Sequence, residues 1–132
     1  MTIPTNAYAL LVSVAMTCTS APAVASASDY AFEPVKADVK TGTGSQIAVR
    51  LVHKPTGNPV TDAVLFRSRL DMSPDGMGAM TTKHEPLPEV EPGVYRFKAN
   101  LTMAGGWALK LMAKIQGEVE TVSATVVFTA KD

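Results

Sequence analysis

Apolar and polar side chains alternate along most of the chain after residue 27, and clusters of Gly and Pro interrupt the alternation at short intervals. A period of two places successive side chains on opposite faces of a strand, whereas a helix repeats every three to four residues. The clearest example begins at Tyr95 and ends at Met103, where Tyr, Phe, Ala, Leu and Met alternate with Arg, Lys, Asn and Thr. The pattern predicts an all-β chain.

Further strands are predicted by the same alternation, with one more expected between Phe32 and Lys40. Their inward residues are predicted to be Ile47, Val49 and Leu51, then Val64, Phe66, Leu70 and Met72, then Trp107, Leu109, Leu111, Ala113 and Ile115, and finally Val122, Ala124, Val126 and Phe128. The turn Ala104-Gly105-Gly106 favours a hairpin between its flanking strands. About seven short strands predict an immunoglobulin-like antiparallel β-sandwich, with Trp107 in its core.

Residues 1 to 27 have the features of a signal peptide. They contain no charged side chain, they include an apolar stretch from Ala7 to Met16, and they end in Ala25-Ser26-Ala27. The apolar stretch is about half as long as a bilayer-spanning helix requires. We expect cleavage after Ala27, a mature domain of residues 28–132 in the periplasm, and no membrane insertion of that domain.

Composition narrows the possible chemistry. The chain has 132 residues, of which 46% are hydrophobic and 18% charged, so one globular domain is expected. Twelve basic residues balance twelve acidic ones, which argues against nucleic-acid binding. The single cysteine, Cys18, lies in the predicted signal peptide. The only histidines, His53 and His84, stand in no recognisable nucleophile context, so we expect no enzyme.

Methionines are concentrated in one short polar segment that contains Met72, Met77 and Met80. The strands that end at Met72 and at Met103 point the same way if one strand, expected between Met80 and Glu85, lies between them. All four methionines then gather at one end of the sandwich. Thioether sulfur is a soft neutral ligand that suits Cu(I) or Ag(I). His84 adds a nitrogen ligand if residues 80–84 form a loop, whereas His53 is expected at the far end.

Two other interpretations of these methionines remain open. Met72 and Met103 each continue an inward-facing apolar series, so each also fits a purely structural role in the core. Methionine is common at adaptable protein-binding surfaces as well. The alternative function is therefore a metal-free interaction module, in which the loop from Met77 to Met80 and the edge strands dock a membrane efflux or oxidase-assembly partner.

Four short motifs resemble the YtkA-like and FixH-like family. They are Gly57-Asn58-Pro59-Val60, the pair Met72 and Met77-Gly78, then Glu91-Pro92-Gly93-Val94-Tyr95, and Met103-Ala104-Gly105-Gly106-Trp107. The resemblance implies a small exported or membrane-tethered β-sandwich linked to copper handling, heavy-metal efflux or oxidase assembly. Met72, Met77 and Met103 match the family pattern, whereas Ala79 stands where the family has a histidine, so Met80 or His84 would substitute.

Together these features predict a periplasmic copper-binding protein. We expect a Cu(I) chaperone or metal-resistance accessory that passes the ion to a membrane or periplasmic metal-handling partner. The expected ligands are Met72, Met77, Met80 and Met103, with His84.

Overall fold

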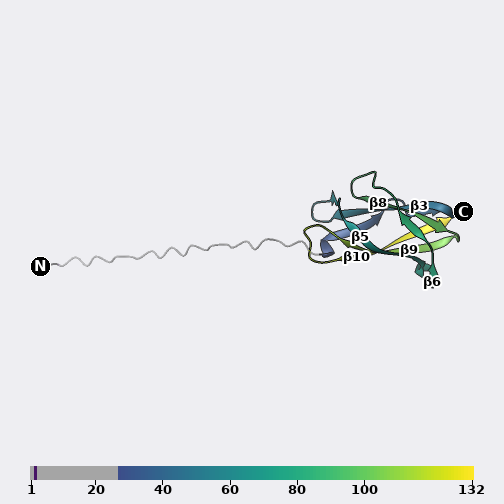
Figure 1. The fold of residues 1–132 in the computed structure, drawn as a ribbon. Coiled ribbons are helices and arrows are strands. Elements are labelled where there is room, and N and C mark those ends of the chain that lie inside the picture. The colour runs from purple at the N-terminus through teal and green to yellow at the C-terminus, as the bar shows by residue number, and fades with distance from the viewer. Residues whose placement is uncertain (1, 3–26) are drawn as a thin grey trace.

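The computed structural model describes Thr2 and residues 27–132, and residues 27–132 form a β-sandwich (Figure 1). The predicted signal peptide lies outside the described residues apart from Thr2 and Ala27, so its cleavage stays a prediction. No described helix is long and apolar enough to cross a membrane. The predicted all-β sandwich is confirmed, and it consists of two five-stranded sheets.

Each sheet joins strands that are distant in sequence. The first sheet has the order β1 (Tyr30–Pro34), β3 (Gly42–His53), β8 (Val94–Leu101), β7 (His84–Pro86), with β4 (Asn58–Pro59) also paired to β3. The second has the order β2 (Asp38–Lys40), β10 (Val122–Lys131), β9 (Gly105–Lys114), β5 (Val64–Met72), β6 (Met77–Thr81). Two short 3-10 helices are η1 (Ala27–Asp29) and η2 (Ser73–Asp75). All strand pairs are antiparallel except β2 with β10, which is parallel.

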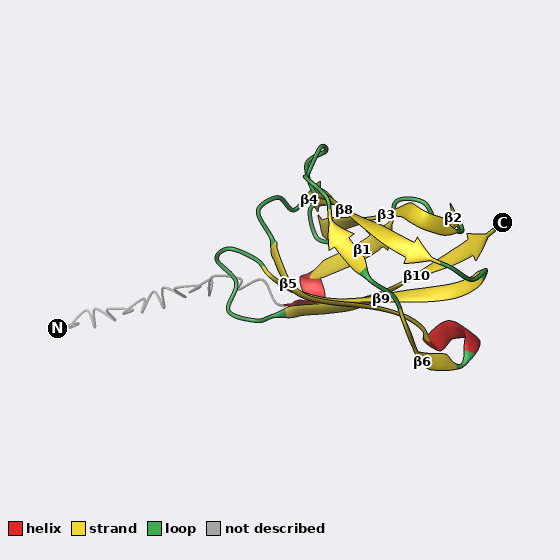
Figure 2. Cartoon of the chain, turned by 45° about the vertical axis from the view of Figure 1, so that its right-hand side comes forward, coloured by secondary structure: helices red, strands yellow, loops and turns green. Residues whose placement is uncertain are grey.

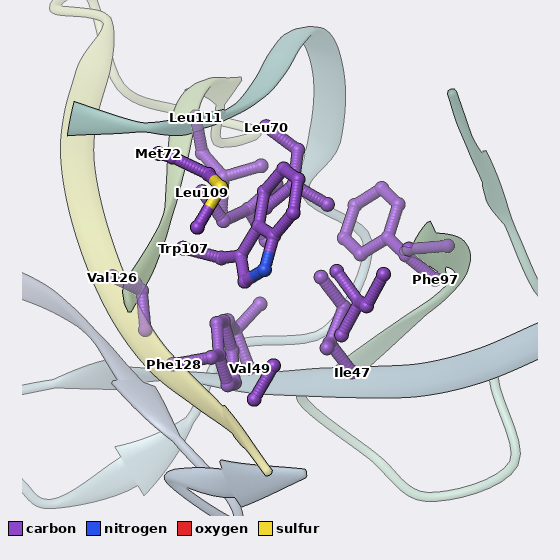
Figure 3. Close-up of a cluster of buried hydrophobic side chains, with 13 residues drawn as sticks. Ile47, Val49, Leu70, Met72, Phe97, Trp107, Leu109, Leu111, Val126 and Phe128 are labelled. Atoms are coloured by element: carbon purple, nitrogen blue, oxygen red, sulfur yellow. The ribbon is translucent and has the colours of Figure 1, made fainter. Parts of the chain in front are cut away.

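The core lies between the two sheets and contains most of the predicted inward residues (Figure 3). Trp107, as predicted, is only 1% exposed. Burial of each large apolar side chain stabilises the fold by about 1.5–3 kcal/mol. The predicted inward positions that are confirmed as buried are Ile47, Val49, Leu51, Leu70, Met72, Phe97, Ala99, Leu101, Trp107, Leu109, Leu111, Ala113, Ile115, Val122, Val126 and Phe128.

Strands β8 and β9 do not form the predicted hairpin. They belong to different sheets, and the connection formed by residues 102–104 crosses from one sheet to the other. Both strands have one apolar face, and these faces cover the same core from opposite sides. The segment between Phe32 and Lys40 likewise divides into β1 and β2, which lie in different sheets.

The predicted inward orientation is wrong for the first half of β5. Val64 and Phe66 are 62% and 51% exposed, whereas Leu65 packs against the main core. A register shift between Leu65 and Arg67 changes the phase of the strand against β9. A bulge inserts one extra residue into the strand. The side chains before the bulge therefore point to the face opposite to the one predicted by continuing the alternation back from Met72.

The two ends of the sandwich differ in the segments that they carry. Tyr30, which directly follows η1, pairs with His53 at one end of the sandwich. At the opposite end of β3, Gly42 pairs with Leu101, shortly before Met103. His53 therefore lies at the end remote from Met103, as predicted. Figure 2 shows η2 and β6 together at the right-hand end of the sandwich.

Candidate metal site

The methionine loop, residues 72–81, turns the chain from β5 into β6 through η2. Pro74 occupies the first turn of η2, where its fixed φ is compatible with helical backbone. Gly76 ends the helix with a φ of 75°, and its N–H donates to the carbonyl oxygen of Ser73 at 3.0 Å. This left-handed position favours glycine. The loop is therefore a compact turn that projects beyond the sheet (Figure 2).

The methionine loop packs on the first residues of β9. The main-chain N–H of Gly106 donates to a carboxylate oxygen of Asp75 at 2.9 Å. A Cβ at Gly106 would lie 2.8 Å from the Cβ of Pro74, and a Cβ at Gly105 would collide with the Asp75 carboxylate. Gly105 also has a φ of +132°, which L side chains rarely adopt. The paired glycines thus allow the loop to lie against this strand.

The connection at residues 102–104 meets β9 at the same place. The indole Nε1 of the buried Trp107 donates to the carbonyl oxygen of Met103 at 3.0 Å. The side chain of Met103 remains 41% exposed because β8 already ends at Leu101. The sequence prediction that position 103 continues the inward series is therefore wrong. The indole fixes the backbone and leaves the thioether accessible to solvent.

Asp71, which the sequence analysis did not identify, holds the base of the methionine loop. Its carboxylate is completely buried and lies 2.9 Å from Nε of Arg69 and 3.1 Å from Nζ of Lys110. It also accepts a hydrogen bond from the N–H of Ser73 at 3.0 Å. Arg69 in turn donates to the carbonyl oxygen of Gly78 at 2.8 Å. One carboxylate thus links both arms of the loop to β9.

The surroundings of Asp71 keep its side chain ionised. Hydrogen bonding with Ser73 lowers its pKa most, and Arg69 and Lys110 lower it further, while burial acts in the opposite direction. The resulting pKa lies well below the ordinary value for aspartate. The sequence signal that identifies this group is the spacing of Arg69 and Asp71, which places both on one face of a strand.

Met72 is a core residue in this structure. Its side chain is 0% exposed and belongs to the main apolar cluster, which also contains Trp107 (Figure 3). Its methyl carbon lies 3.1 Å from the position that a Cβ on Gly105 would take. The structure therefore brings Met72 to the predicted end of the sandwich but places its thioether where solvent does not reach it.

The other three methionines lie closer to solvent. Met77 pairs by register with Met72 and packs partly against the core. Met80 and Met103 are 39% and 41% exposed. Residues 72–81 and 102–104 lie at the same end of the sandwich, because both contact the first residues of β9. That the four methionines form one ligand set stays a prediction. Met80 follows Met77 in β6, between the two residues that pair with β5.

His84 lies in β7 of the first sheet, apart from the strands that carry the loop. Its Nε2 is 2.7 Å from Oγ of Ser68, and its Nδ1 is 3.4 Å from the carbonyl oxygen of Thr82. The ring also meets Phe97 edge-on, with 5.8 Å between centroids. A tautomer protonated at Nδ1 satisfies both hydrogen bonds. In this position His84 joins the two sheets and does not turn a free nitrogen toward the methionine loop.

The single strand expected from Met80 to Glu85 is divided between the sheets. Thr82 marks the crossing, because its N–H donates to the carbonyl oxygen of Leu70 at 3.1 Å and its Oγ1 donates to that of Asn100 at 2.6 Å. The two acceptors belong to different sheets. This division carries His84 away from Met80.

The accessible donors of the site are thioethers. Within residues 27–132, no three His, Cys, Asp or Glu side chains lie close enough together to hold a metal ion. Met77, Met80 and Met103 carry soft, neutral thioethers on two segments, residues 72–81 and 102–104, which both contact the first residues of β9. Such donors fit a monovalent soft ion better than Zn(II), Mg(II) or Ca(II).

One family model matches this chain. The model of the YtkA-like family matches residues 25–112. Among curated proteins, none matches this sequence. Four chains of solved structures match. One of these, the "ZirS C-terminal Domain", is 11% identical with a TM-score of 0.45, and the alignment covers 99% of this chain and 88% of that chain.

Proposed function

The chain belongs to the YtkA-like family, and on that premise we propose that it is a periplasmic Cu(I)-binding protein that delivers the ion to a metal-handling partner. The observation that carries this proposal is the meeting of two methionine-bearing connections, residues 72–81 and 102–104, on the first residues of β9. The copper link implied by the family resemblance agrees with the softness of the donors gathered there.

Met77, Met80 and Met103 are the proposed ligands. Their partial exposure supports this assignment, because an ion that is exchanged between proteins has to be reached from outside. Met72 lies in the core, in the same apolar cluster as Trp107. Ag(I), which has the same charge and similar softness, is expected to bind the same donors.

The chemistry of thioethers suits delivery to a partner. Each sulfur is neutral and has no proton to lose on binding, unlike a cysteine thiol or a histidinium. Because three weak donors can be replaced one at a time, the ion can pass to a partner by ligand exchange. The protein's role in this proposal is binding and transfer, with no catalytic step.

The test is a titration of the mature chain with Cu(I) in competition with a chelator. Replacing Met77, Met80 and Met103 together by Leu is expected to weaken binding by at least about a hundredfold, equivalent to roughly 2.7 kcal/mol. Met112→Leu is the matched control, because Met112 is a half-buried methionine on β9 outside the site. His84→Gln is expected to retain the wild-type affinity.

Three results would contradict the proposal, and the third concerns the control variant. One is the absence of Cu(I) binding by a folded wild-type domain. Another is binding that the triple variant retains in full. A loss of affinity in Met112→Leu equal to that in the triple variant would show that the ion binds elsewhere.

A further inference from the structure

One edge of the second sheet is open along the first half of β5. On the side of β5 away from β9, the strand β6 pairs only with Asp71 and Met72. No other strand of residues 27–132 pairs with β5 there. The carbonyl of Leu70 points to this side, since it accepts from Thr82. Because alternate residues direct their main-chain groups to the same side, Ser68 offers its N–H and C=O to the open edge.

Exposed apolar side chains lie beside these main-chain groups. Val64 and Phe66, which the bulge turns away from the core, are 62% and 51% exposed. Beside them a cleft of about 360 Å³ opens between the sheets, and its lining includes Leu65, Leu87 and Tyr95. The edge therefore combines unpaired main chain with room for inserted side chains.

The outer face next to this edge is positively charged. Arg67, Arg69 and Lys110 line an open groove of about 450 Å³ on the second sheet. The carboxylate of Asp71 lies close to these cations, but it is completely buried and already paired with Arg69 and Lys110. The chain as a whole has a formal net charge of zero. This face is thus a local concentration of cations suited to acidic groups.

We propose that the open edge of β5 binds an extended acidic segment of a partner protein by strand addition. Alternate side chains of an added strand point to opposite faces. Apolar side chains of the partner would enter the cleft, and carboxylates would face Arg67, Arg69 and Lys110. The added strand would end against β6, next to Met80, so the segment would bring its protein to the proposed copper site.

A second copy of this chain fits the edge poorly. Antiparallel pairing of two β5 edges brings Arg67 and Arg69 of one copy close to those of the other. Like charges directly opposite on paired strands are destabilising. The charge of the edge therefore favours an acidic partner over self-association.

The experiment uses a fluorescein-labelled, capped peptide that alternates valine with glutamate, titrated with the mature domain in the absence of metal. Binding is measured by fluorescence anisotropy, and the contact is located by NMR shifts of main-chain amides. We expect shifts at Ser68 and affinity that falls as salt rises. Arg67→Glu and Val64→Ser, both at exposed positions, are each expected to weaken binding at least about tenfold.

Matched controls distinguish binding at this edge from nonspecific binding of the peptide. Val127→Ser changes a valine that is 47% exposed on β10, away from β5 in the same sheet, and is expected to bind the peptide as the wild type does. A peptide with lysine in place of glutamate is expected not to bind. Equal binding of both peptides, equal loss in Val127→Ser, or dimers that Val64→Ser dissociates would overturn the proposal. Because metal is absent, this test is independent of copper binding.

Discussion

Asp71 connects three parts of the chain although solvent does not reach it. It contacts Arg69 on its own strand, Lys110 on β9 and the backbone of Ser73 in η2. A buried carboxylate is tolerated only when charges and donors compensate for lost hydration. The residue therefore contributes to the fold and to the position of the loop at once.

Asp71→Asn is expected to lower the free energy of unfolding by about 2 kcal/mol at neutral pH, since it removes charge-assisted hydrogen bonds. The pKa of Asp71 is lowered in the folded state. Its contribution is therefore present above the unfolded-state pKa, about 4, and is lost as the pH falls below that value. Urea unfolding of both proteins between pH 7 and pH 3 measures this difference. A gap between them that widens on acidification would contradict the assignment.

Tyr95 anchors the crossing from β4 to β5. Its hydroxyl donates to the carbonyl oxygen of Val60 at 2.9 Å and accepts from the N–H of Ala63 at 3.1 Å. Tyr95→Phe is expected to cost about 1–2 kcal/mol of unfolding free energy, because both backbone groups lose their partner. Tyr30→Phe, which removes one hydrogen bond to Glu118, is the control and is expected to cost less. Chemical denaturation compares the two, and equal losses would refute the anchoring role.

At the scale of elements, the glycines of the Met-Ala-Gly-Gly-Trp motif are explained by the packing of η2 on β9. Gly106→Ala places a Cβ against Pro74 and is expected to destabilise the domain by about 1–3 kcal/mol. Gly44→Ala is the control, because a Cβ there meets only the end of Lys98 at 3.5 Å. Thermal unfolding and NMR shifts of the methionine loop measure the effect. Similar stability of the two variants would show that the loop does not need this contact.

At the scale of the whole molecule, the proposed site joins two segments that only the folded state brings together. Cu(I) at a hundredfold excess over its dissociation constant is expected to raise the free energy of unfolding by about 2.7 kcal/mol. Because thioethers do not titrate, we expect the same increase at pH 6 and pH 8. Calorimetry with and without Cu(I) measures the increase. An increase that differs strongly between the two pH values would indicate ligands other than methionine.

The sequence by itself determined which side chains of most strands face inward and that the chain is all-β. Alternation is a local property of the covalent chain, so it identified Ile47, Leu109 and Trp107 as core residues without knowledge of their neighbours. Strand direction also predicted that the segments of Met72 and Met103 meet at one end, because successive antiparallel strands end alternately at the two ends of the sandwich.

Only the tertiary structure decided which sheet each strand joins. It thereby decided whether each candidate ligand is buried, exposed or engaged in another contact. The bulge that exposes Phe66 exists because β5 and β9 pair out of step, which neither strand encodes alone. The burial of Met72 depends on β9, and the hydrogen bond from Ser68 to His84 depends on the contact between sheets. Such contacts arise between segments far apart in the chain, so no local pattern of side chains records them.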